Sequence, residues 1–248
     1  SSTEETIEVT SKALTQNGLD LILSQADKQA EAITNQIENA QFVAQTFAND
    51  IAHLSDSPVL SALSDKEKRD YLTDKLLGLF KGYPDYLGMM LPLEPNVIGD
   101  DSGFTFTDGG ENELDGHISS GQFVPYWYEE NGQYILDKVS SVVDPAKNAY
   151  YTCPKNRSAP CLIDPDKFDL GGVTYLLTTV SVPILKEGSF LGVVGVDFSA
   201  NFVQQLVEQS DTQLYGGKGA VYLVSSDANI IAYSENASMA GQALSQAN

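Results

Sequence analysis

The sequence predicts an α+β fold, in which one long N-terminal helix precedes a set of antiparallel strands. Two observations lead to this prediction. Apolar and small residues recur every three or four positions from Leu19 to Leu54, which is the spacing of a helix that packs along another long element. From about residue 86 the pattern changes to short apolar or alternating runs, separated by turn sequences such as Asn131-Gly132, which is typical of β-hairpins.

The long helix is expected in residues 1–60, with its apolar stripe on one face. The stripe consists of Leu19, Leu23, Ala26, Ala30, Ile33, Ile37, Ala40, Ala44, Phe47, Ile51 and Leu54. Packing along the sheet of its own domain explains this stripe, and so does packing against a second copy of the chain. A long helix has more than one face to bury, so both can hold, and a homodimer through this helix is expected in the full protein.

Residues 61–210 are expected to form the main unit of the chain. The capping box of Ser64 and Glu67 opens a second helix, which ends near Gly82. Strands are expected at 86–93, 103–107, 122–128, 133–139, 173–185 and 190–198. Asp197 or Ser199 is then expected to cap a helix that continues to about residue 208.

Residues 211–248 resemble the beginning of another unit. They contain one more hairpin, at 220–224 and 229–233, and then a run of small and polar residues. An isolated two-stranded hairpin cannot bury a core. The unit is therefore expected to be cut short here, or to be completed by residues 1–18 and a further segment.

The charge balance excludes several kinds of partner. The chain has 34 acidic and 14 basic residues, which gives a net charge of −20. Such a surface repels phosphate backbones and anionic lipid headgroups, so nucleic-acid binding is not expected. The same charge is compatible with a cationic ligand, but an adaptation that keeps the protein soluble in a salty exterior is the preferred explanation.

Two cysteines, Cys153 and Cys161, are expected in one polar loop that contains proline. A disulfide between them would place the chain in an oxidising compartment. A zinc site would need more ligands, and both histidines, His53 and His117, are distant in the sequence. Two reduced thiols are the alternative.

No motif for catalysis or for cofactor binding is present. The sequence lacks a phosphate-binding loop, a dinucleotide fingerprint, a His-Glu-x-x-His pair and a Gly-x-Ser-x-Gly elbow. The acidic segments at 99–102, 108–113 and 164–169 lack the spacing of a calcium-binding loop, so solvated loops are expected there. The sequence therefore predicts neither an enzyme nor a cofactor or metal site.

Aromatic and acidic residues are concentrated near the expected strand ends. The aromatic ones are Tyr126, Trp127, Tyr128, Tyr150 and Tyr151, and the acidic ones are Glu94, Asp164, Asp166, Asp169 and Asp197. Aromatic rings attract a cation and carboxylates neutralise it, so this set fits a small amine. Core aromatics and turn acids would give the same pattern without a ligand.

Several strings, in order along the chain, resemble the double-Cache domains of methyl-accepting chemotaxis proteins and of some sensor kinases and diguanylate cyclases. They are Leu-Gly-Met-Met-Leu-Pro-Leu-Glu-Pro-Asn from residue 87, Phe-Val-Pro-Tyr-Trp-Tyr from 123, Ala-Tyr-Tyr-Thr-Cys-Pro-Lys from 149 and Gly-Val-Val-Gly-Val-Asp from 192. The resemblance implies two stacked PAS-like units, with 61–210 as the membrane-distal, ligand-binding unit and 211–248 as the start of the membrane-proximal one. It also implies a periplasmic or extracellular location, with flanking membrane helices that this chain lacks.

The resemblance also bears on the ligand. Amino-acid sensors of the family carry Arg-x-Trp-Tyr, in which Arg holds the ligand carboxylate, whereas this chain has Asn148 at the Arg position and Tyr150 at the Trp position. Asp197 matches the family's strand-end Asp. Relatives with Glu-Pro-Asn and Pro-Tyr-Trp-Tyr include amine sensors, although Leu93 and Glu129 replace an aromatic residue and an arginine expected beside these motifs.

The predicted function is a chemoreceptor sensor domain that binds a small cationic amine and signals through a transmembrane helix. The expected ligand-binding residues are Glu94, Tyr126, Trp127, Tyr128, Tyr150, Tyr151, Asp166, Asp169 and Asp197. Two alternatives are a sensor for an amino acid or carboxylate on a histidine kinase or diguanylate cyclase, and a structural module that senses nothing.

Overall fold

The computed structural model describes residues 2–110, 112–170, 173–199, 201–224 and 228–246. The chain divides into two compact units. The larger unit comprises residues 37–199, and the smaller one comprises residues 1–36 together with 200–248.

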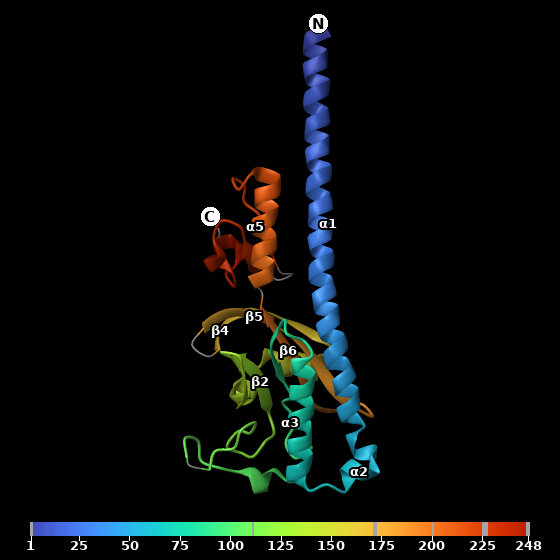
Figure 1. The fold of residues 1–248 in the computed structure, drawn as a ribbon, viewed down its shortest axis with the longest axis vertical. Helices are drawn as coiled ribbons and strands as arrows, with labels where there is room; N and C mark the ends of the chain where they lie inside the picture. Colours follow the sequence, from blue (N-terminus) through green and yellow to red (C-terminus); the bar gives the residue numbers. More distant parts are fainter. Residues whose placement is uncertain (1, 111, 171–172, 200, 225–227, 247–248) are drawn as a thin grey trace. The chain divides into compact units, whose positions relative to one another are not determined.

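Five α-helices and eight β-strands are present in the described residues, coloured in chain order in Figure 1. The helices are α1 (Ser2–Ala52), α2 (Pro58–Ser61), α3 (Asp65–Lys81), α4 (Ala149–Arg157) and α5 (Asn201–Tyr215). The strands are β1 (Tyr86–Met90), β2 (Pro125–Glu130), β3 (Gln133–Lys138), β4 (Cys161–Leu170), β5 (Val173–Lys186), β6 (Ser189–Ser199), β7 (Tyr222–Val224) and β8 (Ile230–Tyr233). The predicted α+β class, with one long N-terminal helix, is confirmed.

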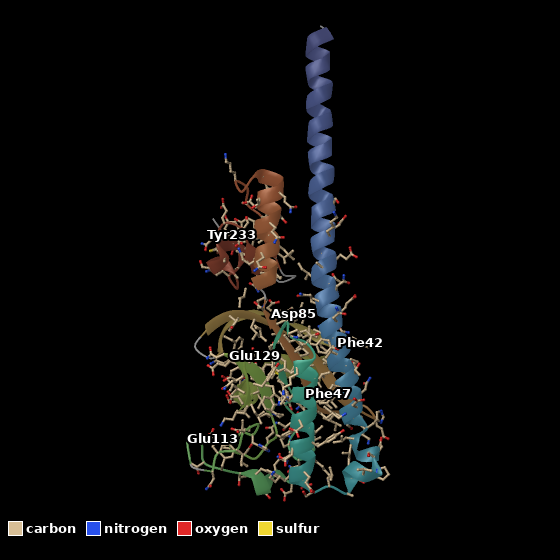
Figure 2. The ribbon with its side chains drawn as sticks, in the orientation of Figure 1. Phe42, Phe47, Asp85, Glu113, Glu129 and Tyr233 are labelled. Atoms are coloured by element: carbon tan, nitrogen blue, oxygen red, sulfur yellow. A yellow bond between two sulfur atoms is a disulfide. The ribbon has the colours of Figure 1, made fainter. Side chains whose placement is uncertain are left out.

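Within the larger unit, α1 buries one face and exposes another. The buried residues include Ala40, Ala44, Phe47 and Ile51 of the predicted stripe, whereas Phe42 is 72% exposed. Figure 2 labels Phe42 and Phe47 on this helix. The spacing of apolar residues therefore identified the buried face of this part of α1 correctly. No described helix is both long enough and apolar enough to cross a bilayer.

Helix α3 begins at the predicted capping box. Ser64 Oγ accepts a hydrogen bond from the Glu67 N–H (3.3 Å), and the Glu67 carboxylate accepts one from the Ser64 N–H (2.8 Å). The helix buries Leu72, Leu76 and Phe80, which lie one turn apart along a single face. This face packs on β1 and β2.

The larger unit contains one antiparallel sheet of six strands, in the order β3-β2-β1-β6-β5-β4. In its register, Gly88 is paired with both Tyr128 and Asp197, and Asp197 is paired with Thr179. Residues that pair directly point to the same face of a sheet. These four residues therefore form one row across one face.

The next residues along the strands define the opposite face. Trp127 is paired with Met89, and Met89 with Val196, so this row alternates with the first. Trp127 Nε1 donates a hydrogen bond to the Thr73 carbonyl of α3 (3.0 Å). The Trp127 face is therefore the α3 side of the sheet, and the Asp197 face is the other side.

Two expected local structures are wrong, and one of the two expected helix caps is excluded. Residues 101–104 form a short 3-10 helix instead of a strand, and Phe104 there stacks on the Arg69 guanidinium, 3.7 Å from its ring centroid. Residues 149–157 form α4 and 161–170 form β4, where polar loops were expected, so Cys153 is helical and Cys161 opens a strand. Asp197 caps no helix, because it lies within β6 and its carboxylate faces the sheet.

The smaller unit contains α5 and the hairpin of β7 and β8. Val203 and Val207 of α5 pack against Ala232 of β8. The hairpin was predicted correctly, but α5 continues to Tyr215 instead of residue 208. The two compact units divide between residues 199 and 200, so α5 belongs to the smaller unit, where its apolar residues pack against this hairpin.

Candidate functional site

The candidate site lies on the face of the sheet that α4 covers, and Asp197 is its most buried acid. Asp197 is 3% exposed, and its carboxylate accepts hydrogen bonds from Thr179 Oγ1 (2.6 Å) and from the Tyr126 hydroxyl. Burial raises the pKa of Asp197 to about 6, although the two hydrogen bonds oppose this shift. Within the described residues, no Lys or Arg pairs with this carboxylate.

Tyr126 reaches Asp197 by crossing Gly88 on the neighbouring strand. A methyl group at residue 88 would overlap the Tyr126 hydroxyl and the adjoining ring atoms. Only glycine therefore leaves room for this ring on β1. Burial, and next the charge of Asp197, raise the pKa of the Tyr126 phenol well above its usual value, so Tyr126 is a hydrogen-bond donor at neutral pH.

Helix α4 holds two further tyrosines against this face. Tyr150 and Tyr151 are buried together with Met90, Val124 and Val193. The Tyr150 hydroxyl lies 3.1 Å from Ser141 Oγ. Burial raises the pKa of Tyr150, the hydrogen bond with Ser141 lowers it, and the charge of Asp197 raises it further.

A disulfide connects α4 to the start of β4. Cys153 and Cys161 are bonded in the structure, with an S–S distance of 2.02 Å. Cys161 is paired with Ser181 in β5, and so belongs to the sheet. Since Pro154 weakens the hydrogen bonding of this nine-residue helix, the covalent link helps to fix α4 over the sheet.

Glu94 is a second carboxylate on the same side, at the edge of α4. Its Oε1 accepts hydrogen bonds from the Tyr151 hydroxyl (2.5 Å) and from Lys155 Nζ (2.5 Å). Tyr151 also meets Phe190 edge to face, with 5.5 Å between the ring centroids. Burial, and next the hydrogen bond to Glu94, raise the pKa of Tyr151.

The structure brings together five of the nine expected ligand-binding residues and places others differently. The five are Glu94, Tyr126, Tyr150, Tyr151 and Asp197. Tyr128 lies on the same face and stacks on Tyr126 (5.8 Å between centroids), in the row of Asp197. Trp127 is on the opposite face against α3 and does not reach this site. The side chains of Asp166 and Asp169, on β4, lie outside the described residues.

Four residues of the site were not predicted from the sequence: Gly88, Thr179, Lys155 and Phe190. Alternation along 173–185 places Thr179 and Ser181 on one face, but only the register shows that this face is the Asp197 side. Lys155 is one helical turn after Tyr151, a relation that could not be recognised while 149–157 was expected to be a loop.

Asn148 and Glu129, which replace arginines expected in the family, do not substitute for them. The Asn148 side chain is buried and donates to the Val142 carbonyl (3.0 Å), so it supports the turn before α4. Glu129 is exposed on β2, at the position labelled in Figure 2. No group of three potential metal ligands occurs among the residues that the structure describes.

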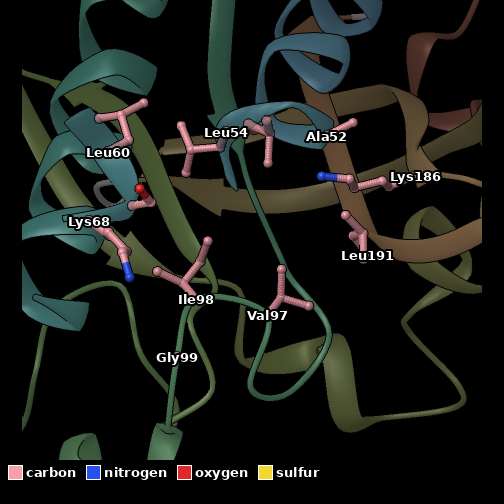
Figure 3. Close-up of a pocket in the computed structure, with 11 residues that line it drawn as sticks. Ala52, Leu54, Leu60, Lys68, Val97, Ile98, Gly99, Lys186 and Leu191 are labelled. Carbon is pink, nitrogen blue, oxygen red and sulfur yellow. The ribbon is translucent and has the colours of Figure 1, made fainter. Parts of the chain in front are cut away.

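A separate cavity of about 180 Å³ lies at the end of α1 (Figure 3). Its lining is largely apolar, with Leu54, Ile98 and Leu191 among the residues. The two lysines that line it are already paired with aspartates, Lys186 with Asp56 (2.7 Å) and Lys68 with Asp65 (3.5 Å). This cavity shares no residue with the Asp197 site.

Comparison with known proteins matches this chain to bacterial sensor domains. Residues 84–205 match the family described as methyl-accepting chemotaxis protein-like, first PDC sensor domain. The chain is 29% identical over 212 residues to the methyl-accepting chemotaxis protein TlpQ of Pseudomonas aeruginosa, and the match covers 82% of this chain and 29% of that protein.

Solved structures share the fold, two chemoreceptor sensor domains among them. The periplasmic sensory domain of the Campylobacter jejuni chemoreceptor Tlp1 superposes with a TM-score of 0.62 at 14% identity, covering 90% of this chain and 74% of that one. The ligand-binding domain of the Pseudomonas aeruginosa amino acid chemoreceptor PctC, solved with GABA, gives a TM-score of 0.55 at 14% identity, covering 89% and 77%.

Proposed function

Because residues 84–205 of this chain form a methyl-accepting chemotaxis protein-like PDC sensor domain, of the double-Cache class, we propose that the chain is the periplasmic ligand-binding part of a chemoreceptor and that its ligand is a small cationic amine. A sensor domain of this kind is not an enzyme. The ligand lies between α4 and the Asp197 face of the sheet. Its binding shifts the population of two arrangements of the helices that lead to the membrane.

The buried Asp197 carboxylate is the observation that supports an amine. A buried charge is costly unless a counter-charge accompanies it, and the described residues around Asp197 offer hydroxyl groups only. A ligand ammonium supplies this missing charge. The rings of Tyr126 and Tyr150 provide aromatic surface for the same cation.

Charge also argues against a ligand that carries a carboxylate of its own. The site holds two carboxylates, Glu94 and Asp197, against one ammonium, Lys155. Asn148 stands at the position of the family's carboxylate-binding arginine, and its side chain donates a hydrogen bond to the Val142 carbonyl. A bidentate carboxylate clamp at this position is therefore absent.

Calorimetry with three ligands of equal chain length tests the assignment. Butylamine, 1,4-diaminobutane and 4-aminobutyrate differ only in the group at one end. We expect the diamine to bind and 4-aminobutyrate to bind at least about tenfold more weakly, since its carboxylate meets an acidic site. If 4-aminobutyrate, the ligand in the PctC structure, bound and the diamine did not, the amine assignment would be contradicted and the sensor assignment would remain intact.

A further inference from the structure

The ammonium group of Lys155 occupies a complete amine-binding environment. Its Nζ donates to Glu94 Oε1 (2.5 Å) and lies 5.6 Å from the ring centroid of Tyr151 and 5.4 Å from that of Phe190. A carboxylate and two aromatic rings around one primary ammonium are the groups that recognise a free alkylammonium ion. The chain thus contains a bound alkylammonium of its own.

We propose that Glu94, Tyr151 and Phe190 form an ammonium subsite, which Lys155 fills in the absence of ligand and which one end of an amine ligand occupies by displacing Lys155. This inference rests on the proposed function, because it names the second point at which the amine is held. The buried Asp197 is the first. A diamine, with an ammonium at each end, is the class of ligand that uses both points.

The subsite is assembled from three segments and stays in place when Lys155 leaves it. Glu94 follows β1, Phe190 belongs to β6 and Tyr151 belongs to α4. The Tyr151 hydroxyl donates to the same Glu94 oxygen as Lys155 (2.5 Å), so the carboxylate remains oriented without the lysine. The link from Cys153 to the sheet keeps the Tyr151 helix in position.

Lys155 can leave because its side chain is 43% exposed at the edge of the site. Moving this ammonium into water costs little free energy, since exposed ion pairs contribute about 0–1 kcal/mol to stability. The tether nevertheless gives Lys155 a local concentration on the order of millimolar, so it competes with every weak amine. The affinity of the site is thereby lowered, and only a ligand that gains contacts elsewhere displaces the lysine.

Another role for Lys155 would give the opposite result on substitution. If Lys155 received a ligand carboxylate in place of the missing arginine, removing it would weaken binding. If it imitates the ligand ammonium, removing it strengthens binding. The sign of the change therefore distinguishes the two roles.

The deciding experiment compares Lys155→Met with wild type by calorimetry. We expect 1,4-diaminobutane to bind about five- to tenfold more tightly to Lys155→Met, because the internal competitor is gone. Lys66→Met is the matched control. It also removes one positive charge from an exposed ion pair (Lys66 to Asp70, 2.6 Å), outside the site, and should change the affinity less than about twofold. An unchanged or weaker affinity in Lys155→Met overturns the proposal.

A second measurement does not depend on the natural ligand. In Lys155→Ala the subsite is left without its ammonium, and butylammonium chloride should raise the melting temperature more than sodium chloride of equal concentration does. The wild type should show a smaller difference, because Lys155 already fills this subsite. If wild type binds no amine but this rescue occurs, the proposed function fails and the subsite stands. If wild type binds the diamine and no rescue occurs, the subsite fails alone.

Discussion

Two buried carboxylates in the larger unit have opposite kinds of partner. Asp101 accepts hydrogen bonds from Arg69 Nη2 (2.6 Å) and from the Asn96 N–H (2.9 Å), and so has its cation within the fold. Asp197 is bonded to the hydroxyls of Thr179 and Tyr126 only. A carboxylate that already has a cation stabilises the loop around it, whereas one that lacks a cation is free to bind one from outside.

The Glu-Pro-Asn segment contributes to both regions. Glu94 belongs to the α4 side of the sheet, where it meets Tyr151 and Lys155. Asn96, with a positive φ of 63°, exchanges hydrogen bonds with Asp101, accepting its N–H at 3.0 Å. Asn tolerates this left-handed conformation better than most residues. The segment therefore connects the candidate site to the buried ion pair of Arg69 and Asp101.

Breaking the ion pair of Arg69 and Asp101 should give the largest effect on stability. Arg69 is 1% exposed and also donates to the Gly121 carbonyl (2.9 Å). Arg69→Met leaves Asp101 buried and unpaired, and should lower the free energy of unfolding by about 3–5 kcal/mol in urea denaturation. Lys66→Met, at an exposed position of the same helix, is the control and should cost less than about 1 kcal/mol. A loss in Arg69→Met as small as that of the control would mean that the ion pair is not structural.

Removing the Asp197 charge should leave the stability intact and weaken the binding of the amine. Asp197→Asn should be at least as stable as wild type at pH 7.5, because a neutral amide relieves a buried charge. Its affinity for 1,4-diaminobutane should fall about 100-fold or more, since the ammonium loses its buried counter-charge. Calorimetry and thermal denaturation measure the two quantities. Unchanged amine affinity would remove Asp197 from the binding site.

The pH dependence follows from the raised pKa of Asp197, about 6 against an ordinary value of 3.8. An acid whose pKa is raised by folding destabilises the fold above that pKa, and this penalty disappears as the pH falls towards 4. Relative to Asp197→Asn, the unfolding free energy of wild type should therefore increase by about 2–3 kcal/mol between pH 7 and pH 4. The comparison with Asp197→Asn cancels the contribution of other acids, such as Glu113, whose pKa is lowered by its hydrogen bond with Lys138 and which therefore stabilise the fold less at low pH.

Amine binding should respond to pH in the other direction. Protonation of Asp197 competes with the ligand ammonium, so the affinity should fall about tenfold for each pH unit below 6. Calorimetric titrations at pH 7.5, 6.0 and 5.0 measure this slope, and Asp197→Asn should show none over the same range. A wild-type affinity that is constant down to pH 5 would show that the ligand does not meet this carboxylate.

The sequence predicted the parts of the fold that depend on local periodicity. The α1 stripe, the capping box of α3 and the hairpins around Asn131 and Glu187 each require only neighbouring residues. The α4–β4 region was missed because its helix contains Pro154 and is fixed by a disulfide and by packing, which are tertiary contacts. For the same reason the acid and aromatic types of the site were predicted, but the contacts among them were not.

Trp127 is the clearest example of information that only the register supplies. A run of three aromatic residues, Tyr126-Trp127-Tyr128, gives no indication of which side chain faces the ligand until the strand is placed. In the sheet, Tyr126 points to Asp197 and Trp127 points to Thr73 on α3. Neighbouring residues of one strand thus belong to the two different faces.

The smallest effect on binding is expected from this pair of neighbours, and it tests the register directly. Trp127→Phe removes the hydrogen bond to the Thr73 carbonyl, and should lower the free energy of unfolding by about 1–2 kcal/mol while changing the diamine affinity less than twofold. Tyr126→Phe removes the donor to Asp197 and should weaken diamine binding by about three- to tenfold, since the carboxylate is then less well oriented. If Trp127→Phe reduced the affinity more than Tyr126→Phe, the assignment of the α4 side as the ligand-binding face would be wrong, because these two side chains cannot share one face of β2.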